Sequence, residues 1–306
     1  MGIDRRGFLK HLSGIGGAAV VGSTSKAFAK KELPGYPDRF GVLVDLTVCI
    51  GCRKCEWACN EVNKLPNKPL EEFEDKSVFE TIRRNHAATY TVVNRFKNSK
   101  TPEAPVYVKK QCMHCDEPAC ASACPVKAFV KTSTGAVIHN PSVCIGCRYC
   151  MAACPFNIPA YEYDDAFTPE VTKCTLCFDR IRQTGTKPAC VQHCPVDALT
   201  FGKRSDMVEL AHDKIQLNPD KYVNHVYGER EVGGTCWMYL SPVPFEEIGF
   251  RTDLGTTPIP EHTRGFLSMV SVVLVAWPAL CMGFYSFSKR REELAAAESQ
   301  TKKEGE

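Results

Sequence analysis

The chain carries its cysteines in four groups of four, and this arrangement constrains the fold more than any other feature. Of 18 cysteines among 306 residues, only Cys236 and Cys281 stand outside these groups. So high a count means that the thiols serve either metal or disulfide chemistry. The groups, in chain order, are Cys49, Cys52, Cys55 and Cys59; Cys112, Cys115, Cys120 and Cys124; Cys144, Cys147, Cys150 and Cys154; and Cys174, Cys177, Cys190 and Cys194.

The third group has the spacing Cys-x2-Cys-x2-Cys-x3-Cys-Pro, which is typical of bacterial ferredoxins. In that pattern three thiolates hold one cubane cluster and the fourth reaches a neighbouring cluster. Gly146 lets the loop turn its backbone N–H groups toward the sulfides, and Pro155 ends it. The first group repeats the spacing with Asn60 in place of the proline, which predicts a helical exit from its loop.

The second and fourth groups are two copies of another design, because both contain Pro-Ala-Cys and end in Cys-Pro-Val. The sequence is therefore an internal repeat, first group with second and third with fourth. It predicts an α+β fold of two ferredoxin-like halves with inserted loops, holding four [4Fe-4S] clusters. Every ligand position is cysteine, so nothing indicates a three-iron centre.

Two other uses of cysteine were weighed. Zinc sites usually pair two Cys-x2-Cys units across a longer gap, and disulfide scaffolds are typical of shorter secreted chains. A zinc-binding structural scaffold stays open as an alternative from the residues alone.

The N-terminus predicts a signal peptide over residues 1–29. Arg5-Arg6 is followed by an apolar run and by Ala27-Phe28-Ala29, as in twin-arginine export signals. This route lets clusters be loaded in a reducing compartment before export. The alternative is a basic start to a buried helix.

The C-terminal part predicts one transmembrane helix over residues 264–288, since 23 uncharged residues run from Gly265 to Phe287. Lys289-Arg290-Arg291 follows the span and only Arg264 precedes it, so the tail, 289–306, should be cytoplasmic and the cluster domain periplasmic. A buried core helix is the alternative.

Between these ends we expect a four-cluster domain over residues 30–235, then a strand and a proline-rich linker over 236–263. The insertion at 60–105 is either a partner-docking face or a solvated loop. The strand candidates are 40–46, 90–96, 136–139, 198–201 and 235–240.

No catalytic constellation is present, so we expect a non-catalytic chain. A net charge of +3 gives no indication of a nucleic-acid partner. His114 and His193 adjoin ligand cysteines and could donate to cluster sulfur. Five cations flank the loops and either offset negative charge on reduction or are solvated: Arg53, Lys54, Lys109, Lys110 and Arg148.

Taken with the signal and the span, the cysteine groups resemble a known family. The likeness is densest in Lys109–Cys115, Cys144–Cys150 and Gly233–Thr235. The family is that of the four-cluster electron-transfer subunits of the complex iron-sulfur molybdoenzyme type, and the chain is most similar to membrane-anchored subunits of periplasmic [NiFe] hydrogenase-2 systems.

The resemblance implies crossed ligation, in which the first group exchanges its last cysteine with the fourth and the second with the third. The four implied ligand sets are Cys49, Cys52, Cys55 and Cys194; Cys174, Cys177, Cys190 and Cys59; Cys112, Cys115, Cys120 and Cys154; and Cys144, Cys147, Cys150 and Cys124.

The resemblance also implies a relay anchored in the inner membrane. Electrons would pass from a hydrogenase small subunit to an integral membrane quinone-reacting subunit. The alternative keeps the relay and changes the catalytic partner to a molybdopterin oxidoreductase, such as formate dehydrogenase or a sulfur or nitrogen oxide reductase, or to a multihaem cytochrome.

Overall fold

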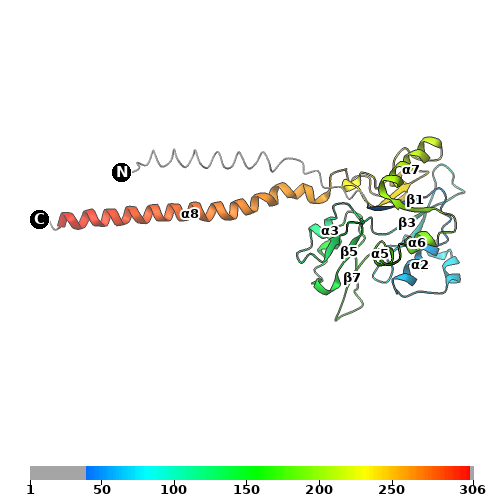
Figure 1. Cartoon of the computed structure of the whole chain (residues 1–306), viewed down its shortest axis with the longest axis horizontal. Coiled ribbons are helices and arrows are strands. Elements are labelled where there is room, and N and C mark those ends of the chain that lie inside the picture. Colours follow the sequence, from blue (N-terminus) through cyan, green and yellow to red (C-terminus); the bar gives the residue numbers. More distant parts are fainter. Residues whose placement is uncertain (1–38, 304–306) are drawn as a thin grey trace. The chain divides into compact units, whose positions relative to one another are not determined.

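The computed structural model describes residues 39–303, so the predicted signal peptide lies outside the described residues. The described chain divides near Pro260 into a unit that contains all four cysteine groups and a C-terminal helix, α8 (Figure 1). The two parts are described separately below.

A three-stranded sheet is the centre of the cysteine-bearing unit. β1 (Phe40–Asp45) lies between β8 (Leu199–Lys203), which is antiparallel to it, and β9 (Trp237–Leu240), which is parallel to it. Helix α7 (Arg204–Leu217) covers one face, where its apolar side chains pack against Leu43 and Met238. The sheet thus joins the start, middle and end of the unit around one buried core.

All five strand candidates are confirmed, because the structure has strands within each of these segments or shifted from it by no more than two residues. Besides those of the central sheet they are β2 (Val92–Phe96) and β5 (Val137–His139). The sequence did not predict α7 or four other strands. These are β3 (Val106–Lys110), paired with β2; β4 (Phe129–Lys131), paired with β5; and the pair β6 (Ala160–Tyr161) and β7 (Val171–Thr172).

Short helices follow the cysteine loops and show which groups meet in space. Helix α2 (Lys54–Val62) packs against α6 (Ala189–Gln192), and α3 (Ala119–Ser122) packs against α4 (Tyr149–Ala153). Figure 1 shows α2 beside α6, with α5 (Phe178–Thr184) close by. In space the first group therefore meets the fourth and the second meets the third, which differs from the order of the sequence repeat. Helix α2 continues past Cys59, as Asn60 predicted.

The segment after residue 235 belongs to the same compact unit, although we expected a separate strand and linker. It supplies β9 and the 3-10 helix η5 (Phe245–Ile248), whose apolar side chains are buried in the main core. Cys236 is fully buried and its thiol donates to the Gly135 carbonyl oxygen at 3.2 Å. The burial of these residues explains why the unit extends to Pro260.

The insertion at 60–105 is attached to the first cysteine loop by a buried carboxylate. Glu56, on α2, accepts from Arg53 and from Arg83, the latter at 2.6 Å, and also from the Val93 N–H at 2.6 Å. Two 3-10 helices, η1 (Leu70–Glu74) and η2 (Ser77–Glu80), each bury a phenylalanine, so the insertion is held against the unit. The remaining 3-10 helices are η3 (Pro141–Val143) and η4 (Glu231–Gly233).

Helix α8 (Ile259–Lys303) is long and apolar enough to cross a membrane, judged by length and composition. Its 45 residues extend beyond the expected span, 264–288, at both ends. Pro278 lies inside the helix. The structure thus supplies one C-terminal candidate for a membrane anchor.

Candidate metal centres

Three cysteines of the first group and the last cysteine of the fourth line one cavity, which we call set 1: Cys49, Cys52, Cys55 and Cys194. The first three come from the loop that leads into α2. Gly51 in this loop has φ +67°, and a Cβ there would lie 2.3 Å from the Tyr107 ring, so glycine is required on both counts. The loop therefore packs closely against β3, which contains Tyr107.

A second cavity has the same design with the two inner groups. Set 3 consists of Cys112, Cys115, Cys120 and Cys154. Lys173 also lines this cavity, just as Lys109 lines the cavity of set 1. In both cavities the fourth cysteine comes from a different group than the first three.

The other eight cysteines form two further sets. In set 2, burial is the main cause of the high pKa of the Cys59 thiol, and the charges of three nearby cysteines of the fourth group raise this pKa further. The set is Cys59, Cys174, Cys177 and Cys190. In set 4, Cys144 and Cys147 interact electrostatically with Cys150, and Cys124 packs against a buried cluster that contains both Cys150 and Cys120. The proposed set, as the resemblance implies, is Cys124, Cys144, Cys147 and Cys150.

Neighbouring sets are close together, and they follow one another in a chain. Electrostatic interactions connect Cys55 with Cys190 between sets 1 and 2. Others connect Cys174 with Cys112 between sets 2 and 3. A third connects Cys120 with Cys150 between sets 3 and 4. The sixteen predicted ligands therefore form a linear series of four sets.

The thiols need a bound cation to ionise. Burial raises the pKa of Cys49 to about 11 and those of Cys120 and Cys174 to about 12, and neighbouring cysteines contribute further. Such thiols are protonated at neutral pH. Thiolate ligation compensates the burial of negative charge with metal charge and releases the protons, so these sites suit a thiophilic metal cofactor.

Backbone amides in the loops already point at sulfur. The N–H groups of His114 and Leu176 donate to Cys112 Sγ and Cys174 Sγ, each at 3.4 Å. Both donors have left-handed φ, 49° and 56° respectively. The left-handed conformation costs a residue other than glycine about 1 kcal/mol. The same strained turn therefore occurs in both loops, and the surrounding structure must stabilise it in each.

His114 supplies an independent test of whether a sulfur cofactor fits. Its side chain is fully buried, and its Nδ1 accepts the Val137 N–H at 2.8 Å. The neutral ring must then carry its proton on Nε2, which has no hydrogen-bond partner among the described residues. An unpaired buried donor costs about 1–3 kcal/mol. His114 lies between Cys112 and Cys115 of set 3, and its partner Val137 lines that cavity, so a cluster sulfur of set 3 is the acceptor that we propose for this donor.

Replacing His114 with asparagine is expected to lower the reduction potential of the set 3 cluster by about 20–60 mV, the equivalent of one hydrogen bond for a one-electron couple. Asparagine Oδ1 can replace Nδ1 as the acceptor for Val137, while the Nε2 donor is lost. Redox titration followed by electron paramagnetic resonance measures the shift. His193→Asn is the control, because the His193 ring already contacts the Ala189 carbonyl oxygen at 2.9 Å. Equal shifts in both variants would contradict the assignment.

The cysteines surround cavities and do not converge on a single point. Between residues 39 and 303, no group of three His, Cys, Asp or Glu side chains is placed to hold one metal ion. A zinc ion requires its sulfur ligands about 2.3 Å from one centre.

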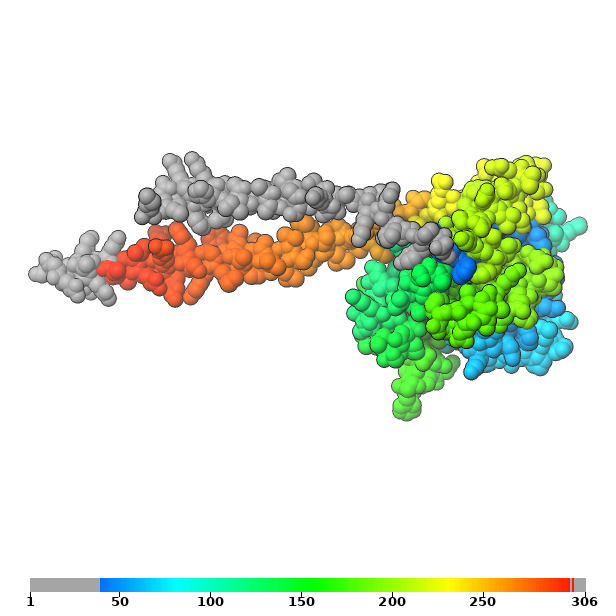
Figure 2. Space-filling model, in the orientation of Figure 1, coloured from blue at the N-terminus to red at the C-terminus, as the bar shows by residue number. Residues whose placement is uncertain are grey.

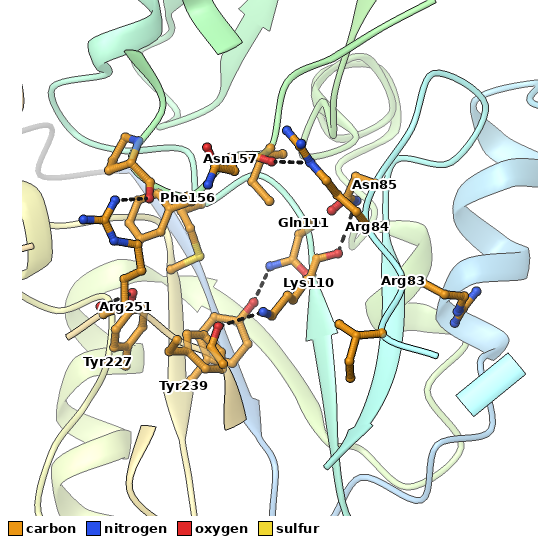
Figure 3. Close-up of a pocket in the computed structure, with 16 residues that line it drawn as sticks. Arg83, Arg84, Asn85, Lys110, Gln111, Phe156, Asn157, Tyr227, Tyr239 and Arg251 are labelled. Atoms are coloured by element: carbon orange, nitrogen blue, oxygen red, sulfur yellow. Dashed lines mark hydrogen bonds between the residues drawn. The ribbon is translucent and has the colours of Figure 1, made fainter. Parts of the chain in front are cut away.

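A cavity of about 250 Å³ lies outside the cysteine sets (Figure 3). Arg84, Lys110 and Arg251 lie at its edge, and Tyr227 and Phe156 form part of its wall. Its lining contains no cysteine, so it is distinct from the candidate metal centres.

Comparisons with known proteins now define the class. Two sequence models, each of a 4Fe-4S dicluster domain, match residues 48–128 and 104–204. Together they cover all four cysteine groups. The chain is thus a ferredoxin-like iron-sulfur protein, and its cofactors are [4Fe-4S] clusters; four groups of four cysteines are consistent with four.

Relatives define the family within this class. A protein of Nitratidesulfovibrio vulgaris is 53% identical over 298 residues, 97% of this chain and 80% of the relative. The hydrogenase-2 operon protein HybA of Escherichia coli O157:H7 is 34% identical over 277 residues, 80% of this chain and 83% of the relative. The nitrate-inducible formate dehydrogenase iron-sulfur subunit of Escherichia coli K12 is 34% identical over 222 residues, 71% and 73% of the two chains. The chain belongs to the family of iron-sulfur subunits that includes these hydrogenase-2 and formate dehydrogenase proteins.

Sequence reasoning missed two features of the site. Lys173 was not singled out, although it directly precedes Cys174, and it is 5% exposed. Lys109 was considered only as a loop cation beside Lys110, whereas it is 3% exposed on β3. The available signal for Lys173 was its place directly before Cys174, and that for Lys109 was its place after the apolar residues of a strand, three positions before Cys112.

Proposed function

We propose that this chain is a non-catalytic electron-transfer subunit, relaying electrons through four [4Fe-4S] clusters between a periplasmic [NiFe] hydrogenase and an integral membrane quinone-reacting subunit. Each cluster accepts and passes on one electron. The quinone chemistry belongs to the partner. The proposed ligands of the clusters are the cysteines of sets 1 to 4, which correspond to the crossed ligation implied by the family resemblance.

The observation that carries this proposal is that the loop tips at the two ends of the series are more exposed than those in its middle. At the tips of the loops of sets 1 and 4, Ile50 and Ile145 are 50% and 63% exposed. At the corresponding position of set 3, Met113 is 4% exposed, and at that of set 2 Thr175 is half-buried. A relay requires this arrangement, because electrons must enter and leave at the ends and be insulated between them.

The set 4 end offers an apolar surface to a partner. Tyr149 and Tyr163 are more than half exposed, and Phe167 is 94% exposed in the loop between β6 and β7. That loop projects from the unit in Figure 2, where it is green. Large exposed apolar side chains at one end of the series are typical of an interaction site, and a membrane protein is a suitable partner for them. We assign this end to the quinone-reacting subunit and the set 1 end to the hydrogenase.

We further propose that the protein is exported by the twin-arginine route and held by α8, with the clusters in the periplasm and residues 289–306 in the cytoplasm. The basic residues after the span support this orientation. A chain loaded with clusters before export avoids disulfide formation outside the cell.

A molybdopterin oxidoreductase remains the second candidate for the catalytic partner. The formate dehydrogenase iron-sulfur subunit of Haemophilus influenzae is 36% identical over 224 residues, which favours this candidate about as much as the HybA match favours hydrogenase. The zinc scaffold has no comparable support, since both domain matches are to 4Fe-4S domains.

The test is electron delivery in native membranes. Membrane vesicles from cells with and without this chain are given hydrogen or formate, and reduction of the endogenous quinone pool is measured. Hydrogen-dependent quinone reduction should be lost when the chain is absent and return when it is restored. If only formate-dependent quinone reduction is lost, the catalytic partner is the molybdopterin oxidoreductase and not the hydrogenase. If neither reaction is lost, both candidates are contradicted.

A further inference from the structure

Lys109 is a buried ammonium group without a carboxylate partner. It is 3% exposed, and its Nζ donates to Thr91 Oγ1 at 2.7 Å and Gln111 Oε1 at 2.9 Å. Nζ also lies 4.6 Å from the centroid of the Trp237 ring. No Asp or Glu in the part of the chain that the structure describes forms an ion pair with it. Buried charge without a counter-charge is costly, so the compensating charge must come from another source.

The cysteines around Lys109 identify that source. Lys109 lines the cavity of set 1. Burial alone lowers its pKa, but the negative charge that nearby cysteines carry when ionised, that of Cys190 and Cys55 foremost, outweighs burial and raises it. Its charge also reaches Cys59, in set 2, whose high pKa is due first to burial. It is not among the main charges that act on Cys115, Cys120 and Cys154 of set 3 or on Cys150 of set 4.

Strand geometry fixes the direction of the side chain. Successive residues of a strand point to opposite faces, so Lys109 and Lys110 diverge although they are adjacent on β3. Lys110 lies at the separate cavity of Figure 3 and donates to the Gly249 carbonyl oxygen at 2.8 Å. Lys109 is held on the cysteine side by Gln111, whose own amide donates to Tyr239 Oη at 2.6 Å. The ammonium is therefore positioned by a buried network.

We propose that Lys109 is a fixed counter-ion shared by the clusters of sets 1 and 2 and that it raises the reduction potentials of both. Reduction adds one electron and no proton to a cluster, and a nearby cation stabilises the added negative charge. Lys109 would thus act as a positioning charge at the entry half of the relay. This inference rests on the proposed ligation of sets 1 and 2.

The experiment compares purified, detergent-solubilised full-length variants by iron content and by redox titration followed by electron paramagnetic resonance. In Lys109→Gln the reduced-to-oxidised ratio of two of the four clusters, at a fixed potential, should fall about tenfold, which is 59 mV for a one-electron couple. Lys109→Arg should retain the wild-type ratios. The matched control is Lys110→Gln, which removes the adjacent charge from the opposite face and should change none of them.

Gln111→Glu is a second variant that leaves Lys109 in place and neutralises its charge with a carboxylate of equal size. The same two clusters should become harder to reduce. Unchanged ratios in Lys109→Gln with full iron content would overturn the role of Lys109, as would an equal fall in Lys109→Arg. A wild-type protein that lacked the iron of four cubanes would instead overturn the proposed ligation, so the two failures are distinguishable.

Discussion

Replacing Cys194 with serine is expected to remove about a quarter of the iron and acid-labile sulfide, the same loss as that expected from Cys52→Ser. The reason is that both residues line the cavity of set 1, although one belongs to the fourth group and the other to the first. The serine hydroxyl is a weaker ligand for iron than the cysteine thiolate that it replaces, so the cluster is lost. Iron and sulfide analysis with resonance spectra of the reduced protein measures the loss.

Double variants separate crossed ligation from ligation within one group. Cys52→Ser with Cys194→Ser should lose about one cluster, no more than either single variant, because both act on set 1. Cys52→Ser with Cys59→Ser should lose about two, because Cys59 belongs to set 2. The reverse pattern would show that each cluster is bound within a single group. Cys236→Ser is the control and should keep all the iron, since the Cys236 thiol donates to the Gly135 carbonyl oxygen, accepts from Lys131 and lines neither cysteine cavity.

Ending the chain after Pro260 is expected to move the protein from the membrane to the soluble fraction with its iron complete. The cysteine-bearing unit ends at this residue and has its own buried core, so its folding does not require α8. Each Leu, Ile, Phe or Val of a span favours insertion by about 0.3–0.6 kcal/mol. Summed over the apolar residues of α8, this free energy favours the membrane-bound protein over the soluble protein by more than about tenfold. Sedimentation of membranes washed at high salt measures it.

The control for this truncation ends after Ser288, which removes the basic tail and retains the apolar segment. That variant should stay with the membranes. Release of the full-length protein by salt alone would show that α8 does not span the bilayer and that charge holds the protein there. Loss of iron from the shorter chain would show instead that the cluster unit depends on α8.

The cofactor class was predictable from the sequence because cubane ligation imposes its own spacing. The strands were also accessible, since β1 and β9 are runs of apolar and β-branched residues that one sheet can bury. Helix α7 could have been found, because Met207, Ala211 and Ile215 recur every fourth residue. Strands β6 and β7 have two residues each, too few to give a periodic pattern.

Two features could not be derived from local patterns. Each cysteine group alone is compatible with binding its own cluster, so spacing does not say which groups meet; that depends on the packing of α2 on α6 and of α3 on α4. The burial of Lys109 is the other. Adjacent lysines normally indicate a solvated edge, and here one of them is buried among cysteines that would offset its charge once they bind clusters as thiolates.

The nested packing of these helices also sets an order for synthesis. The ribosome releases α3 and α4 in succession, so their loops can meet while the fourth group is still untranslated. Helix α2 must wait until Gln192, at the end of α6, has emerged. The outer part of the relay is consequently finished last, and a nascent chain that stalls before that point leaves the cysteines of the first group without the partner cysteines of the fourth.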